Sequence, residues 1–352
     1  MSVRQYVLSA ARHAKDEREI VVQASCLQRE PQMCTRTGAP QLPSTSGCLS
    51  RSLEGVIGFM NINKPPGMTS HDVVAAVRRC LGRGVKVGHA GTLDPFAQGV
   101  LVICLGKATR LAEYVQHQPK RYRAGIILGA SSETDDPQGP ITPMPDATPP
   151  APDQLADVLA TFVGTIQQTP PAHSAVHVEG QRAYKLARAG EEVRMAPRPV
   201  TIHSIELLGY EYPRFDMDVS CGSGTYIRSL ARDIGAACGS AAYCRELVRT
   251  AIGSFTLERA VGLDSLDIAR DLIEPLAGLA GMPRVTIDSH ARAALVMGKT
   301  VAMDHPVPPG ELVVVDEQGV LVAIAMRAGG PNAARSAVTS ENAIRPTKVL
   351  VD

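Results

Sequence analysis

One short loop carries the side chain best suited to chemistry. Asp94 lies between Leu93 and Pro95 in the segment Gly88-His-Ala-Gly-Thr-Leu-Asp-Pro-Phe-Ala-Gln-Gly99. The proline and the apolar neighbours favour a fixed backbone that presents one carboxylate to a cleft, where it could act as a nucleophile or a base. His89 lies earlier in the same loop. The alternative is purely local structure, in which Asp94 caps the Pro95 turn and His89 packs beside it.

A second candidate is Arg228, in the first turn of a helix expected after Gly222-Ser-Gly224. A helix N-terminus and a guanidinium together favour an anion. That anion could be a phosphate, or it could be the carboxylate of Asp94, whose charged form would then be stabilised against burial. An ordinary surface arginine is the competing interpretation.

Tyr122 stands among three cations in Lys120-Arg-Tyr-Arg123. An aromatic ring that stacks on a base while cations hold phosphates is a common way to seat an unstacked nucleotide. A strand tyrosine with solvated flanking charges fits this tetrapeptide equally well.

The charge distribution says more about partners than the total charge does. The formal net charge is only +1, but Val56 to Arg123 contains ten Lys/Arg against three Asp/Glu. Ala124 to Thr165 contains six acids and no base. A basic block offset by an acidic one lets a nearly neutral protein bind phosphates, although a mixed solvated surface could show the same segregation.

Several function classes are excluded by missing patterns. The eight cysteines form no C-x-x-C pair and no cluster with histidine, so they indicate reduced thiols in a cytoplasm and no metal site. Neither a G-x-G-x-x-G segment nor a full G-x-x-x-x-G-K-[ST] phosphate loop is present, which argues against a nucleotide cofactor. No apolar run of about 18 residues or more occurs, and no secretory signal pattern begins the chain, so no membrane span is expected.

The elements that must position these residues follow from hydrophobic patterns. The uninterrupted apolar run Val100–Leu105 predicts a strand buried on both faces. Thr69 and Asp72 predict the capping box of a helix that ends at Gly82. Further strands are expected at 56–62, 121–128 and 216–221, and further helices at 152–162 and from Gly224 to about Gly239. Residues 167–199 form a polar excursion with a helix-like core at 180–190, and a hairpin is expected at 312–326.

Four segments occur in an order that resembles a known family. They are Gly58-Phe-Met-Asn-Ile-Asn-Lys-Pro-Pro-Gly-Met-Thr-Ser70, Gly88-His-Ala-Gly-Thr-Leu-Asp-Pro-Phe-Ala-Gln-Gly-Val-Leu101, Lys120-Arg-Tyr122 and Gly222-Ser-Gly-Thr-Tyr-Ile-Arg-Ser-Leu230. Together they are similar to the TruB family of bacterial tRNA pseudouridine synthases, which modify uridine 55 in the T loop. The likeness runs from about Val56 to Asp352 and does not extend to the residues before about Gly55.

The resemblance implies an α+β fold with a mixed, mainly antiparallel central sheet. It divides the chain into an N-terminal extension (1–55), which we expect to be disordered and dispensable, a catalytic domain (56–282) and a PUA-like RNA-binding β-barrel domain (283–352). A thumb-like insertion at about 167–199 would clamp the T-stem. His177 stands where the family usually has a lysine, so one backbone contact of this insertion is in question.

The resemblance also implies roles for individual residues. Asp94 matches the nucleophile, Arg228 the arginine that pairs with it, and Tyr122 the tyrosine that stacks on the target base. The remaining substrate-binding positions are His89, which helps to hold the flipped-out loop, Tyr226 and Leu247 in the base pocket, and Lys64, with a structural role and some RNA contact.

The function expected is therefore isomerisation of a tRNA uridine to pseudouridine, without cofactor or metal, by a cytoplasmic monomer that needs no protein partner. One carboxylate could serve as nucleophile at the sugar or as base in a glycal route, and the sequence does not choose between them. Two alternatives stay open. One is a non-catalytic tRNA-binding or folding protein, which would have no use for Asp94 and Arg228 together. The other is a guide-RNA-dependent pseudouridine synthase subunit, although the lysine-rich tail of such relatives is absent here.

Overall fold

The structure is a computed structural model that describes residues 55–82, 84–172, 174, 177–178, 181–182, 195–328 and 342–351. The expectation that the N-terminal extension is disordered falls on residues 1–54, which lie outside the described residues. Within the described part of the chain, no helix is long and apolar enough to cross a membrane.

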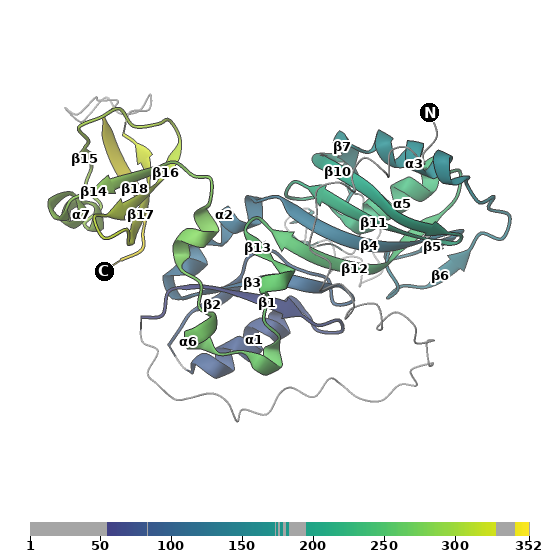
Figure 1. Cartoon of the computed structure of the whole chain (residues 1–352), viewed down its shortest axis with the longest axis horizontal. Helices are drawn as coiled ribbons and strands as arrows, with labels where there is room; N and C mark the ends of the chain where they lie inside the picture. The colour runs from purple at the N-terminus through teal and green to yellow at the C-terminus, as the bar shows by residue number, and fades with distance from the viewer. Residues whose placement is uncertain are drawn as a thin grey trace, which may run out of the picture. The chain divides into compact units, whose positions relative to one another are not determined.

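A mixed, mainly antiparallel sheet forms the centre of the larger α/β part, and the fold class expected from the sequence is confirmed (Figure 1). Its described strands run in the order β1, β3, β12, β4, β11, β10, β7, with β2 beside β3 and β13 beside β12. Neighbouring strands are antiparallel except β12 and β3, which are parallel. The bounds are β1 Gly58–Lys64, β2 Val87–His89, β3 Gln98–Leu105, β4 Lys120–Leu128, β7 Gly164–Gln168, β10 Arg198–Glu211, β11 Arg214–Cys221, β12 Ala242–Ile252 and β13 Phe255–Thr256.

Strand β3 is buried on both faces, as its apolar run predicts. Val100, Val102 and Cys104 belong to one hydrophobic cluster, and the alternating residues Leu101, Ile103 and Leu105 belong to another. Because side chains alternate across a strand, this division places one cluster on each side of β3. The strand therefore gives the preceding loop a rigid end.

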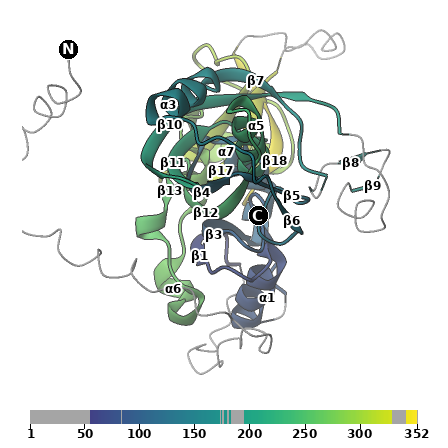
Figure 2. The ribbon, with the colours of Figure 1, turned by 90° about the vertical axis from the view of Figure 1, so that its right-hand side faces the viewer.

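Among the described residues, helices α1, α3 and α5 cover this sheet. Helix α1 (Ser70–Leu81) has the predicted capping box, in which Thr69 and Asp72 satisfy each other's backbone N–H groups. Helices α3 (Pro152–Thr161) and α5 (Ile227–Ala237) lie beside β10 and β11 in both views (Figures 1 and 2). Four residues of α5 pack into the cluster that contains the buried face of β4 and β11: Ile227, Leu230, Ala231 and Ile234.

Smaller elements complete the larger part of the chain. They are α2 (Ala112–His117), α6 (Ile268–Asp271), and the pairs β5 (Ala130–Ser132) with β6 (Ile141–Pro143) and β8 (His177–Val178) with β9 (Gln181–Arg182). The expected excursion leaves and rejoins the sheet at paired positions, because Gln167 lies opposite Pro199 and Gln168 opposite Arg198. Apart from β9, the helix expected at 180–190 lies outside the described residues.

A second, five-stranded sheet follows. Its order is β14 (Arg284–Ile287), β16 (Glu311–Asp316), β17 (Leu321–Arg327), β18 (Ala343–Val349) and β15 (Val301–Ala302), and α7 (Ser289–Val296) packs into its core. Asp316 closes the predicted hairpin by accepting the N–H groups of Gln318 and Val320 on its carboxylate. This sheet is consistent with the PUA-like domain expected from the sequence.

Candidate active site

The loop between β2 and β3 holds Asp94 rigidly because both neighbouring residues are tied down. Ser70, the first residue of α1, accepts the N–H of Leu93 at 2.9 Å and donates to its carbonyl at 3.0 Å. The carbonyl of Pro95 accepts from the backbone N–H of Gly67 at 2.7 Å and from the Lys64 ammonium at 3.3 Å. The carboxylate is therefore presented by a fixed backbone, as the loop sequence predicts.

A buried arginine that the sequence reasoning missed supports the first half of this loop. Arg249 in β12 is 2 % exposed and donates to the carbonyls of Val100 at 2.7 Å, Gly91 at 3.1 Å and Thr92 at 3.2 Å. Gly99 lets β3 approach it, since a Cβ at that position would lie 2.3 Å from the Arg249 carbonyl oxygen. Arg249 thus crosslinks the start of β3 to the residues that lead to Asp94.

Two nitrogens of the Arg228 guanidinium contact the carboxylate of Asp94. Its Nε lies 2.9 Å from one carboxylate oxygen of Asp94, and its Nη2 donates to the other at 3.2 Å. On the other side, Nη1 lies 3.2 Å from the carboxylate of Asp136 and donates to the carbonyl of Thr134 at 2.9 Å. The side chain of Arg228 is only 4 % exposed, whereas 31 % of the Asp94 side chain is open to solvent. Of the two partners that the sequence left open for Arg228, this geometry selects the carboxylate.

The acidity of Asp94 is set by opposing effects. Burial is the largest and raises the pKa of Asp94, the charge of Arg228 lowers it, and the nearby charge of Asp136 raises it again. The net result is a pKa above the usual range of a carboxyl group. Arg228 is therefore the principal group that favours the ionised form against the desolvation of this position.

Two predicted base-pocket residues lie in the same core as the loop. Tyr122 in β4 and Leu247 in β12 are 7 % and 6 % exposed and share a hydrophobic cluster with Leu93. Burial raises the pKa of Tyr122 above its ordinary value, so the ring carries a neutral hydroxyl at neutral pH. The structure thus brings these two side chains and the Asp94 loop together.

The other predicted positions flank this core. His89 ends β2 and contacts His71 edge-to-face, with ring centroids 5.5 Å apart. Burial, aided by His71 and Arg249, lowers the pKa of His89 to about 4, so the imidazole is neutral at neutral pH. Tyr226 directly precedes α5, and the guanidinium of Arg198 lies 5.2 Å from its ring centroid.

Lys64 has a different place from the one expected for an RNA contact. It is 0 % exposed, and its ammonium donates to the carbonyls of Met68 at 2.7 Å, Pro65 at 2.8 Å and Pro95 at 3.3 Å. Burial lowers its pKa to about 8. These three bonds use all three N–H groups, so Lys64 links the backbone at Pro65 and Met68 to Pro95 of the Asp94 loop and has no donor left for RNA.

Comparisons with known proteins identify the family of this chain. Residues 78–227 match the TruB family pseudouridylate synthase (N terminal domain). The tRNA pseudouridine synthase B of Symbiobacterium thermophilum is 45 % identical over 252 residues, which cover 70 % of this chain and 84 % of that protein. The chain belongs to the TruB family. Another relative, tRNA pseudouridine synthase B of Caldanaerobacter subterraneus subsp. tengcongensis, is 37 % identical over 278 residues, 78 % of this chain and 96 % of that protein.

Solved structures also resemble this TruB-family chain. One is an H/ACA RNP bound to a substrate RNA containing 2'-deoxyuridine, with a TM-score of 0.63 and 26 % identity over 84 % of this chain and 85 % of that one. Another is a Cbf5-Nop10-Gar1 complex, with a TM-score of 0.63 and 27 % identity over the same shares of the two chains. The fold is therefore shared with a chain of an H/ACA RNP and a chain of a Cbf5-Nop10-Gar1 complex.

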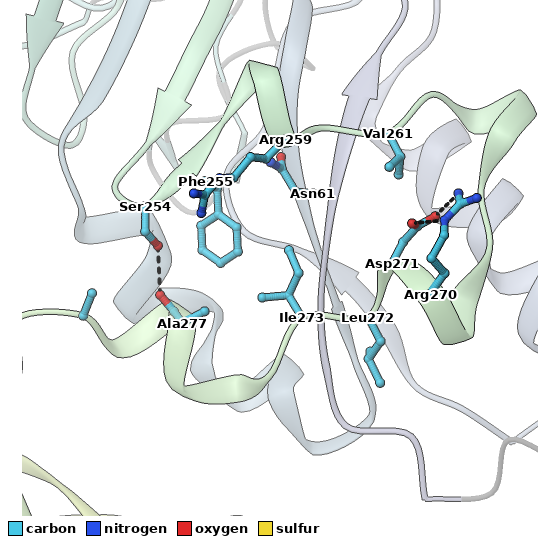
Figure 3. Close-up of a pocket in the computed structure, with 11 residues that line it drawn as sticks. Asn61, Ser254, Phe255, Arg259, Val261, Arg270, Asp271, Leu272, Ile273 and Ala277 are labelled. Atoms are coloured by element: carbon cyan, nitrogen blue, oxygen red, sulfur yellow. Dashed lines mark hydrogen bonds and ion pairs between the residues drawn. The ribbon is translucent and has the colours of Figure 1, made fainter.

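A cavity elsewhere in this TruB-family chain lies along β1 and the segment after β13 (Figure 3). It measures about 480 Å³, and none of the sequence-predicted site residues lines it. Its acid, Asp271, is paired with Arg270 at 2.7 Å, and the hydrogen bond from Arg270 is the main reason that its pKa is lowered. Among the described residues, no cluster of three or more His, Cys, Asp or Glu could hold a metal ion.

Proposed function

We propose that this chain converts uridine 55 in the T loop of tRNA to pseudouridine, with Asp94 as the catalytic carboxylate. The reaction class follows from the family: the chain is a tRNA pseudouridine synthase, an isomerase that acts on a uridine in tRNA. The single observation that supports the role of Asp94 is its two-point ion pair with the buried Arg228, at 2.9 and 3.2 Å, at the end of a rigid loop.

The chemistry needs little beyond one positioned carboxylate. The bond from uracil N1 to ribose C1′ breaks, a bond from C5 to C1′ forms, the proton on C5 is lost, and N1 gains one. Product and substrate contain the same atoms, so no oxidant, reductant or group donor is required. Asp94 serves either as nucleophile at the sugar or as base in a glycal route, and both roles require its ionised form, which Arg228 favours.

The neighbouring side chains fit a flipped uridine. A base inside a folded RNA loop must leave its stack before an enzyme can reach its glycosidic bond. Tyr122 would stack on the flipped uracil, with Leu247 and Tyr226 completing the base pocket. His89, held neutral by burial, would occupy the RNA loop that the base has left, where a neutral ring stacks without attracting phosphate.

Two alternatives, a guide-RNA-dependent subunit and a pure RNA-binding protein, can be distinguished from this function by experiment. A guide-RNA-dependent subunit is favoured by the structural likeness to proteins in H/ACA and Cbf5-Nop10-Gar1 complexes. Stand-alone action on tRNA, as a cytoplasmic enzyme without an obligatory protein partner, is favoured by relatives that are named tRNA pseudouridine synthase B and are 37–45 % identical. A pure binding protein would have no need of the Asp94–Arg228 pair.

The test is incubation of the purified full chain with an unmodified tRNA transcript, followed by mapping of pseudouridine by position. We expect one modified position, uridine 55, with no added RNA or protein. A transcript with cytidine at position 55 and the Asp94→Asn variant are the matched controls. Modification elsewhere would contradict the T-loop assignment, activity only with added guide RNA would favour the subunit, and tight binding without pseudouridine would favour the binding protein.

A further inference from the structure

The helix that carries Arg228 lacks a cap of its own. The N-cap residue of α5 is Tyr226, which has no side-chain hydrogen bond to the first turn. Uncapped helix ends leave backbone groups that need outside partners when they are buried. The position of Arg228, two residues after this N-cap, therefore depends on whatever holds the Tyr226 backbone.

Gln168, at the end of β7, is that outside partner. Its side-chain oxygen accepts the backbone N–H of Tyr226 at 2.8 Å, and its side-chain nitrogen donates to the Tyr226 carbonyl at 3.1 Å. Gln168 is 0 % exposed, so water does not compete for these two bonds. A primary amide that bonds both backbone groups of one residue fixes that residue in position and orientation.

Thr169, which follows Gln168, also bonds α5, at residues that come after Arg228 in the chain. The carbonyl of Thr169 accepts from the hydroxyl of Ser229 at 2.9 Å and from the guanidinium of Arg232 at 3.0 Å. The contacts of Gln168 and Thr169 thus bracket Arg228 along the chain. The pairing partner of Gln168 adds a further tie, since Arg198 donates to the carbonyl of Gly224 at 2.7 Å.

We propose that Gln168 is a positioning residue, which holds the start of α5 so that Arg228 meets both oxygens of Asp94. The side-chain amide of Gln168 bonds the backbone of Tyr226 and not Asp94, so its effect on Asp94 acts through the start of α5 and Arg228. This proposal rests on the proposed function, because it assumes that Asp94 is the reactive carboxylate. A displacement of about 1 Å at a catalytic group can slow a reaction about a hundredfold, so a loosened helix start is enough to matter.

The test compares Gln168→Leu with the parent and with Gln167→Leu. Gln167 is the exposed neighbour on the same strand, so it controls for a change of amide to hydrocarbon in β7. We expect Gln168→Leu to lower kcat about tenfold or more with KM changed less than about threefold, and Gln167→Leu to match the parent. Gln168→Glu, which keeps an oxygen to accept the Tyr226 N–H, should recover part of the loss.

The pH profile separates positioning from general damage to the fold. The charged and titratable groups that face Asp94 are Arg228, Asp136, Arg249, Lys64, Tyr122 and Cys244. If Arg228 moves away, the ionised form of Asp94 loses its main support, so the acid limb of kcat must move to higher pH. The ratio of variant to parent kcat should then rise about threefold or more between pH 6 and pH 8. A smaller folded fraction would instead lower kcat by the same factor at both pH values.

The outcomes are distinct. An unchanged kcat in Gln168→Leu, or a lower kcat with an unmoved acid limb, overturns the positioning role. If Gln168→Leu fails to fold, Gln168→Glu has to show the same shift in smaller measure, and an unmoved limb there refutes the proposal as well. Full activity of Asp94→Asn would instead refute the proposed function, whatever the Gln168 variants do.

Discussion

Arg228→Met tests the central ion pair most directly. Methionine keeps a long side chain in α5 but removes the guanidinium that bonds Asp94, Asp136 and the carbonyl of Thr134. Two carboxylates then face each other without a cation. Because Arg228 is the main group that lowers the pKa of Asp94, its removal raises that pKa further and reduces the ionised fraction at any given pH.

The structure gives the size of two effects. Removing one partner of a buried ion pair destabilises a fold by about 3–5 kcal/mol, and the 31 % exposure of the Asp94 side chain favours the lower end, about 3 kcal/mol. Turnover should fall by at least about a thousandfold, since the loss includes both the ionised state and the geometry of Asp94. Arg228→Lys keeps the charge but offers one ammonium instead of a planar fork, so we expect residual turnover with an acid limb at higher pH.

The assay is single-turnover pseudouridine formation from pH 5.5 to 8.5, with denaturant unfolding of the same preparations. Arg214→Met is the matched control, because Arg214 also bridges two carboxylates, Asp216 at 2.8 Å and Glu246 at 2.9 Å, but its side chain is 39 % exposed. That control should lose no more than about 1 kcal/mol and keep full turnover. Near-parent turnover by Arg228→Met, or an unmoved acid limb in Arg228→Lys, would refute the reasoning.

Four further outcomes are expected. Asp94→Asn should abolish turnover while tRNA affinity, measured by filter binding, stays within about tenfold; near-parent turnover would refute the catalytic role. Tyr122→Phe keeps the ring, so affinity should stay within about threefold, and a slower reaction would assign a role to the hydroxyl. Binding should weaken with salt, and each lost phosphate contact, such as that of an exposed lysine or arginine of the 64–123 block, should reduce the log–log slope by about 0.7–0.9, whereas a flat response would argue against RNA. Burial raises the pKa of Asp135 from 3.8 to about 6, so the folded state binds the carboxyl proton more tightly than the unfolded state does. The free energy of unfolding should therefore fall as pH rises from about 4 to 7. Asp135→Asn should reduce this dependence of the free energy of unfolding on pH, and an unchanged slope would contradict the raised pKa of Asp135.

The sequence predicts a strand or helix where the hydrophobic pattern of that segment alone is enough to identify it. The run Val100–Leu105 has apolar residues at every position, and it forms a strand between two clusters. Strand β12 was missed because Arg245, Glu246 and Arg249 interrupt its apolar pattern, although Arg249 is buried. Strand β10 was missed because most of its residues are exposed and Pro199 lies near its start, where proline is typical of an edge or an end.

The same distinction applies to the site. Asp94 and Arg228 could be predicted because a loop motif and a helix start identify them locally. Gln168 and Arg249 could not, because a glutamine or an arginine at such positions is ordinarily a solvated side chain. Their partners are distant in sequence: the backbone of Tyr226 for Gln168, and the carbonyls of Gly91, Thr92 and Val100 for Arg249.

Buried cations would keep the proposed catalytic carboxylate, Asp94, ionised beside polyanionic RNA. Arg249 and Lys64 donate to backbone carbonyls of the Asp94 loop or of the residues that border it, and Arg228 bonds the carboxylate itself. Arg228 and Arg249 both lower the pKa of Asp94, which opposes the larger effect of burial. Because their guanidiniums lie inside the fold, bulk salt screens them much less than it screens exposed lysines. Catalysis and RNA affinity should therefore respond differently to salt: binding depends on the exposed basic block, whereas the ionised state of Asp94 depends on charges that the solvent hardly reaches.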